Sequence, residues 1–110
     1  MSNEIVLFNP LMLSDEQFDA IASLSALNYT YEQMSIYLEI DFDQFIKALN
    51  SKNSKVQHHI TRGKLESKFL VNEKLLQNAQ SGNITAAQEL RKVIDANDVE
   101  EIKKKILYGE

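Results

Sequence analysis

Basic and amide side chains gather in the middle of this 110-residue chain, between Gln44 and Arg62. Lysine, arginine and protonated histidine bind phosphate oxygens, and glutamine adds a neutral donor, so such a row suits a nucleic-acid backbone. The alternative is a solvated surface whose long side chains only cover the core. The residues that we select as candidate DNA contacts are Gln44, Lys47, Lys52, Lys55, His58, His59 and Arg62.

Other kinds of site chemistry find little support in the sequence. There is no cysteine, so neither a disulfide nor a thiolate ligand or nucleophile is available. Neighbouring residues on a helix diverge by about 100°, so His58 and His59 do not readily share a metal ion. The sequence has no glycine-rich phosphate loop and no nucleophile elbow. We therefore expect a non-enzymatic protein with no metal and no cofactor.

The charged residues are distributed unevenly along the chain. Residues 1–50 hold eight acids and one base, residues 51–92 eight bases and three acids, and residues 93–110 five acids and three bases. The segments therefore carry −7, +5 and −2, which together give the net charge of −4. A protein that only coats DNA would be basic overall. The polarity favours self-association, an acidic partner at the middle segment, or both, unless the solvated faces differ by chance.

Residues 30–49 have the spacing of a helix-turn-helix, a small unit that places a helix in a DNA groove. Leu38 lies on the inner face of the first helix, and Ile40 fills the turn. Phe45 and Leu49 give the second helix its inner face. The alternative is a three-helix bundle that shares this geometry without binding DNA.

Two features of this segment depart from the usual pattern. The turn position that is normally glycine holds Glu39, where a positive φ angle would strain the backbone. The second helix carries Asp41 and Asp43, which repel phosphates, and Lys47 is its only cation. DNA contacts would therefore come from Gln44, from Lys47 and from the loop that follows, rather than from the start of that helix.

The fold class that we predict is all-α, with three parts. Residues 1–13 are an apolar N-terminal arm that packs on its own domain or on a neighbouring subunit. Residues 14–53 are a helix-turn-helix domain, in which capping boxes at Ser14 and Thr30 begin helices. Residues 54–110 are a long spine helix plus a C-terminal helical hairpin, to which we assign oligomerisation.

The spine helix is predicted over residues 55–80 and has two apolar faces, so it should contact partners on both sides. Gly63 marks a point where two backbones cross closely or where the helix bends. Residues 81–83 end the helix, and two further helices follow, the second capped by residues 98–101. One face of the spine helix holds Val56, Ile60 and Gly63, with Leu70 and Val71 near it, and the other holds Leu65, Phe69, Leu76 and Ala79.

A larger pattern joins these parts. The helix-turn-helix phrase Glu32-Gln33-Met34-Ser35-x-x-Leu38-x-Ile40 precedes a basic stretch from Val56 to Lys64. The phrase Ala79-x-x-Gly82-Asn83-x-x-Ala86 follows it. This order resembles the small terminase subunits of tailed bacteriophages and the related prophage helix-turn-helix proteins, over about residues 14–94.

The resemblance implies a non-enzymatic subunit that recognises viral double-stranded DNA for genome packaging. Such a subunit assembles with itself into a ring and presents the DNA to a large subunit with ATPase and nuclease activity. By position, the resemblance carries DNA contact onto Gln44 and Lys47 in the second helix and onto Lys52 and Lys55 after it. It also implies a location in the cytoplasm of a bacterial host cell.

Neither a signal peptide nor a run of about 20 apolar residues is evident, so we expect no membrane span. Two other functions stay open at this point. One is a protein-interaction or virion-structural helical module without DNA binding, which the acidic first half favours. The other is a small helix-turn-helix transcriptional regulator, which would act as a dimer on symmetric half-sites.

Overall fold

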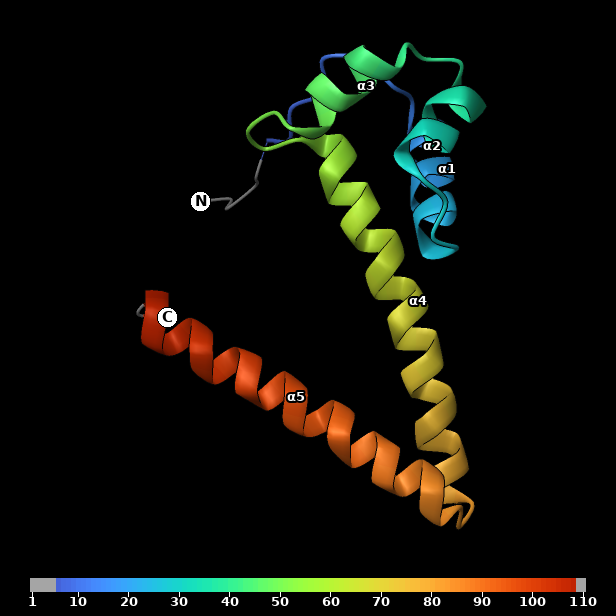
Figure 1. The fold of residues 1–110 in the computed structure, drawn as a ribbon, viewed down its shortest axis with the longest axis vertical. Coiled ribbons are helices and arrows are strands. Elements are labelled where there is room, and N and C mark those ends of the chain that lie inside the picture. Colours follow the sequence, from blue (N-terminus) through green and yellow to red (C-terminus); the bar gives the residue numbers. More distant parts are fainter. Residues whose placement is uncertain (1–5, 109–110) are drawn as a thin grey trace. The chain divides into compact units, whose positions relative to one another are not determined.

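The computed structural model describes residues 6–108, with side chains for residues 6–101, and each of its regular elements is an α-helix (Figure 1). The predicted all-α class is therefore confirmed. The helices follow the sequence-based boundaries closely up to Gln80. They are α1 (Asp15–Ala26), α2 (Tyr31–Leu38), α3 (Phe42–Leu49), α4 (Lys55–Gln80) and α5 (Ile84–Tyr108).

The chain divides into two compact units, Met1–Ser67 and Lys68–Glu110. α4 is uninterrupted, so its first half belongs to the first unit and the remainder to the second. Among the described side chains, Ala86 is the buried apolar residue of the second unit. The first unit holds the core, which comprises Leu13, Phe18, Ile21, Ala22, Met34, Phe45, Ala48, Leu49, Val56 and Ile60.

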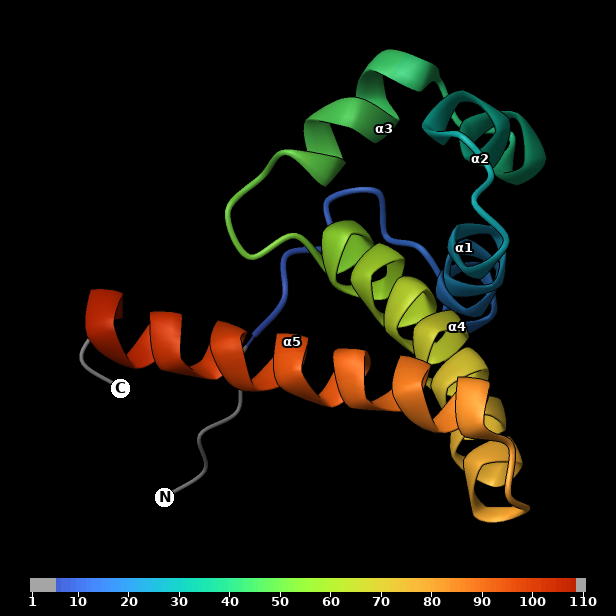
Figure 2. The ribbon, with the colours of Figure 1, turned by 60° about the horizontal axis from the view of Figure 1, so that its bottom comes forward.

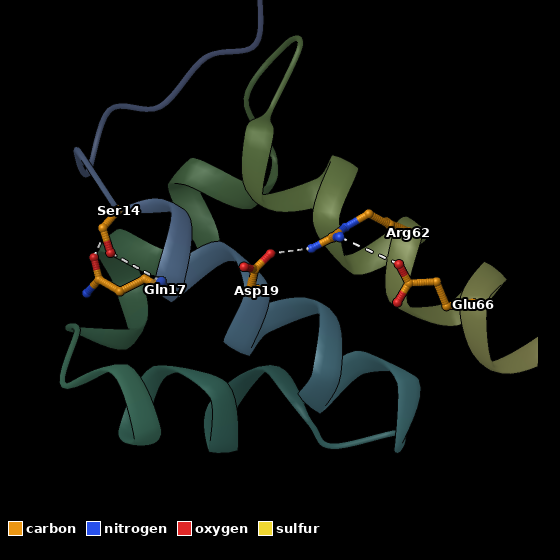
Figure 3. Close-up of polar contacts among 5 residues, drawn as sticks. All are labelled: Ser14, Gln17, Asp19, Arg62 and Glu66. Atoms are coloured by element: carbon orange, nitrogen blue, oxygen red, sulfur yellow. Dashed lines mark hydrogen bonds and ion pairs between the residues drawn. The ribbon is translucent and has the colours of Figure 1, made fainter.

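α1 and α2 both begin with the capping boxes expected from the sequence. The backbone N–H of Gln17 donates to Ser14 Oγ at 3.2 Å, and the Ser14 N–H donates to Gln17 Oε1 at 2.9 Å (Figure 3). Thr30 and Gln33 repeat the arrangement at the start of α2. These bonds satisfy N–H groups that the first turn of a helix leaves without a partner, so they fix where each helix starts.

Residues 39–41 connect α2 to α3 in a short turn. Glu39 adopts φ 57° and ψ 44°, the left-handed conformation that usually requires glycine. Ile40 packs against the core from the turn, and Asp41 caps α3 by accepting the Gln44 N–H at 3.2 Å. The predicted inner face of α3 is confirmed, because Phe45 and Leu49 are buried.

α1 lies alongside the first half of α4 in both ribbon views (Figures 1 and 2). Ser25 Oγ donates a buried hydrogen bond to the backbone carbonyl of Ile60 at 2.7 Å. A Cβ at Gly63 would collide with the backbone carbonyl of Ala22, so the two helices approach through a position that only glycine fits. Of the two readings of Gly63, the close backbone crossing is therefore the one observed.

The apolar arm is tied to the first unit where the structure describes it, from residue 6 onward. The Phe8 N–H donates to the Asn53 carbonyl at 2.6 Å, and the Lys55 N–H donates to the Phe8 carbonyl at 2.9 Å. Leu13 enters the core, and Leu11 packs against it. The arm thus packs on its own domain, whereas residues 1–5 lie outside the described range.

The second unit differs from the sequence prediction at one point. Gly82 has φ +98° and Asn83 accepts the Ala86 N–H at 2.9 Å, which is the predicted stop and restart. The further break at residue 98 is wrong, because residues 84–108 form one helix. Asp98 is tolerated inside a helix, and no glycine or proline interrupts residues 84–108.

The side chains of residues 102–108, in the region predicted as a separate last helix, lie outside the described side chains. Within the described part of the chain, no helix combines the length and apolar character needed to cross a membrane.

Candidate nucleic-acid interface

α3 presents two of the candidate residues on its outer side. Gln44 and Lys47 are exposed, whereas Phe45 and Ala48 point into the core. Helical spacing puts Lys47 on the side away from the buried stripe, and it puts Gln44 at the edge of that stripe, one turn before the buried Ala48. A lysine and an amide there can each contact a phosphate oxygen without disturbing the packing of the unit.

The N-terminal arm borders this side of α3. Phe8, Pro10 and Leu11 form one wall of an open groove of about 300 Å³, and α3 forms the other. The α3 wall comprises Gln44, Lys47, Ala48 and Ser51. The arm therefore lies beside the side chains of Gln44 and Lys47 and blocks one side from which a ligand could approach them.

Lys52 lies in the loop between α3 and α4 and is exposed. The loop is held from both ends. Ser51 Oγ donates to the Lys47 carbonyl at 2.7 Å, and the next loop residue, Asn53, has φ 56° and accepts the Phe8 N–H. Because these bonds fix the backbone on both sides of Lys52, its exposed side chain starts from a fixed backbone position.

Lys55 and His59 occupy the same side of α4, but their partners are within the protein. The Lys55 Nζ lies 4.7 Å from the centroid of the Phe18 ring, in a cation–π arrangement. The His59 ring stacks on the same Phe18 ring, with the two ring centroids 4.8 Å apart. Both side chains therefore pack on α1, and His58 is the exposed histidine of the pair.

The environment of His59 favours its neutral form. Desolvation by burial lowers the pKa of His59 below its ordinary value of 6.5, and the electrostatic effects of Arg62, His58 and Lys55 add to that decrease. Asp19 acts in the opposite direction. His59 Nδ1 is buried without a hydrogen-bond partner in the protein. A neutral, stacked ring is poorly suited to hold a phosphate and well suited to pack α4 on α1.

Arg62 is engaged in two ion pairs (Figure 3). One guanidinium nitrogen lies 2.9 Å from Asp19 Oδ1 on α1, and the other lies 3.5 Å from Glu66 Oε1 on α4. The Arg62 side chain is 37% exposed, so solvent screens these pairs. Binding a phosphate through Arg62 would compete with both carboxylates.

The seven candidates thus fall into two groups. Gln44, Lys47, Lys52 and His58 are exposed on α3, the loop and α4. Lys55, His59 and Arg62 contact Phe18 or residues beside it. The sequence did not predict Phe18 and Asp19 as the partners of these three residues. The apolar stripe of α1 indicated that Phe18 is buried, but nothing in the spacing indicated that it lies against α4.

In the part of the chain whose residues are described, no group of three or more histidine, cysteine or acidic side chains suited to a metal ion occurs. Comparison of the chain with protein-family models, with curated proteins and with solved structures gives no significant match.

Proposed function

We propose that this protein is a non-enzymatic, homo-oligomeric DNA-binding subunit of the small-terminase kind. In this role it binds viral double-stranded DNA in the host cytoplasm and presents it to a large ATPase and nuclease subunit. α2 and α3 serve as the helix-turn-helix, with Glu39 in the turn position that usually holds glycine. Binding depends on phosphate contacts more than on base readout.

The observation that carries the proposal is the exposed polar side of α3 on a packed scaffold. α3 buries Phe45, Ala48 and Leu49, which leaves Gln44 and Lys47 free to meet a ligand. Lys52 adds a second cation in a loop whose backbone is fixed at Asn53. Rigid backbone around two cations reduces the entropy lost on binding.

The charge distribution supports phosphate contact at the end of α3 rather than at its start. Asp41 is already used as the α3 cap, and Asp43 lies in the same first turn. Both carboxylates disfavour a phosphate near the start of the helix. Lys47 lies in the last turn, where a cation is also favourable for the helix dipole.

Salt-titrated binding of the full chain to duplex DNA tests the proposal. Each phosphate contact that is lost reduces the slope of log K against log salt by about 0.9, so Lys47→Ala/Lys52→Ala should reduce it by about 2. These two lysines make no ion pair among the described residues, so the fold should be retained. Lys55 and Arg62 are left intact because they contact Phe18 and Asp19.

The matched control is Lys64→Ala/Lys74→Ala, which removes the same charge from two exposed positions on α4, away from α3 and the loop. Its slope should equal that of the wild-type protein. Equal loss of slope in both double variants would show that only net charge matters, and absence of binding at low salt would remove the DNA role altogether.

The alternative is a protein-interaction or virion-structural module, favoured by one specific observation. Arg62, the arginine of the basic stretch, is already paired with Asp19 and Glu66 within the chain. A basic surface that its own carboxylates neutralise has less charge to offer DNA. This alternative predicts a stable oligomer that does not bind duplex DNA at any salt concentration.

A further inference from the structure

Among the described side chains of the second unit, most of the larger apolar ones lie in solvent. On α4, Phe69 is 65% exposed and Leu76 is 43% exposed. Leu65, one turn before Phe69 on the same helix, is 60% exposed. Among the described side chains of these two helices, Ala86 is the buried apolar residue, which is less core than a segment of this size needs for stability. Leu65, Phe69 and Leu76 therefore give α4 one exposed apolar face, and Leu70 and Val71 are exposed on another.

These α4 residues have the spacing of a coiled-coil seam. Leu65, Phe69, Asn72, Leu76 and Ala79 are separated by four, three, four and three residues, which is the a/d pattern of a heptad repeat. Phe69 and Leu76 occupy a positions, and Asn72 is a polar residue at the d position between them. A single polar layer within an apolar seam selects one register over its neighbours, at some cost in stability.

The charged residues that flank the seam on one copy of the helix are complementary to those on a second copy. Lys68 occupies a g position, and Glu73, five residues later, occupies the following e position. In a parallel, in-register pair of helices, g of one chain faces this e of the other, so two Lys68–Glu73 pairs form by symmetry. Antiparallel pairing would instead place Glu66 and Glu73 against glutamates of the other chain, because e then faces e.

From this combination we propose that α4 binds a second copy of the same chain. The helices associate in parallel and in register along Phe69, Asn72 and Leu76, with Lys68 of each copy facing Glu73 of the other. Within the described side chains, neither Lys68 nor Glu73 takes part in an ion pair, so both are available. The inference rests on the homo-oligomer in the proposed function and specifies one surface through which two copies pair.

A second copy fits this face better than an unrelated helix does. Only identical chains in register place the polar Asn72 opposite another Asn72, where the two amides can hydrogen-bond. The same symmetry pairs both lysines with both glutamates at once. The seam is short, so association should be reversible and depend on protein concentration.

Cysteine cross-linking of the full chain reads the register directly, because the natural sequence has no cysteine. In Asn72→Cys, the two thiols face each other across the seam, so oxidised glutathione should convert most of the protein into a disulfide-linked dimer. The matched control is Lys74→Cys, which lies about 160° away around α4, on the opposite side. This variant should remain largely monomeric on a denaturing, non-reducing gel.

Charge reversal provides a second test that introduces no new bond. Lys68→Glu places glutamates opposite glutamates, and it should raise the dimer dissociation constant about tenfold in sedimentation equilibrium. The double variant Lys68→Glu/Glu73→Lys restores complementary pairs and should return to within about twofold of wild type. Rescue is not expected if each side chain contacts something other than its counterpart.

Several results would overturn the inference. They are a monomer at every concentration, preferential cross-linking at position 74, and a dimer that charge reversal leaves unchanged. These outcomes differ from failure of the DNA role. A chain that stays monomeric yet binds duplex DNA contradicts only the proposed pairing along α4. A cross-linked dimer that does not bind duplex DNA contradicts only the proposed DNA-binding role.

Discussion

At the scale of single residues, His59 shows how packing changes the role that a sequence suggests. Its place in a basic stretch predicts a phosphate ligand, whereas its ring stacks on Phe18 with centroids 4.8 Å apart. Burial lowers the pKa of His59, and Arg62, His58 and Lys55 act in the same direction. A proton added to His59 would meet repulsion and a desolvation cost, so the folded protein favours the neutral ring.

This environment makes stability depend on pH. The folded-state pKa of His59 is lowered from the unfolded value of 6.5, so its contribution to stability is present above pH 6.5 and is lost as pH falls below it. Urea unfolding at pH 7.5 and pH 5 should show a larger decrease for wild type than for His59→Phe, which keeps the aromatic stack. The exposed His58→Gln should retain most of the wild-type pH dependence; an unchanged pH dependence in His59→Phe would contradict the assignment.

At the scale of elements, the contact between α1 and α4 organises the first unit. Gly63 lets the backbones approach at Ala22, and Ser25 donates to the Ile60 carbonyl at 2.7 Å. The Arg62–Asp19 pair connects the same two helices at their exposed edge. The basic face of α4 is therefore partly a packing face, which explains why its cations divide between solvent and α1.

Gly63→Ala tests this contact against helix propensity. In an exposed helix the change would stabilise the protein by about 1 kcal/mol, because alanine is the better helix former. Here the added methyl group meets the Ala22 backbone, so we expect a net loss of about 1–3 kcal/mol in the free energy of unfolding.

Urea denaturation is the measurement, and the neighbouring Lys64→Ala, at an exposed position, is the control. Lys64→Ala should change stability by less than about 0.5 kcal/mol. A Gly63→Ala protein as stable as wild type would mean that α1 and α4 do not cross this closely in solution.

At the scale of the whole molecule, the two units differ in how they are stabilised. The described buried apolar side chains belong to Met1–Ser67 apart from Ala86. The second unit instead exposes Phe69, Leu70 and Val71 on α4 and Ile84 on α5. We therefore expect the first unit to fold by itself, and the second to gain stability from the association proposed above.

Fragments that end and begin at the unit boundary test this difference. Residues 1–67 should unfold cooperatively on heating, with a helical circular-dichroism spectrum that does not depend on concentration. Residues 68–110 should gain helix as concentration rises, because two helices without a core are marginal alone. A fragment 1–67 without cooperative unfolding would contradict the division into units.

The sequence by itself determined the local structure of this protein. Capping boxes at Ser14 and Thr30, the αL glycine at Gly82 and the periodic apolar positions are local signals, so they predict helix starts, stops and inner faces. They failed at Asp98, because a residue that favours helix starts is also tolerated within a helix when nothing stops it.

The tertiary structure alone decided which cations are available for binding. Spacing places Lys55, His59 and Arg62 together on α4, but it does not say that Phe18 and Asp19 of α1 lie against them. Those partners are about 40 residues earlier in the chain, and the contact depends on how α1 crosses Gly63. Local signals carry no information about such a contact, since it is made only when the helices pack.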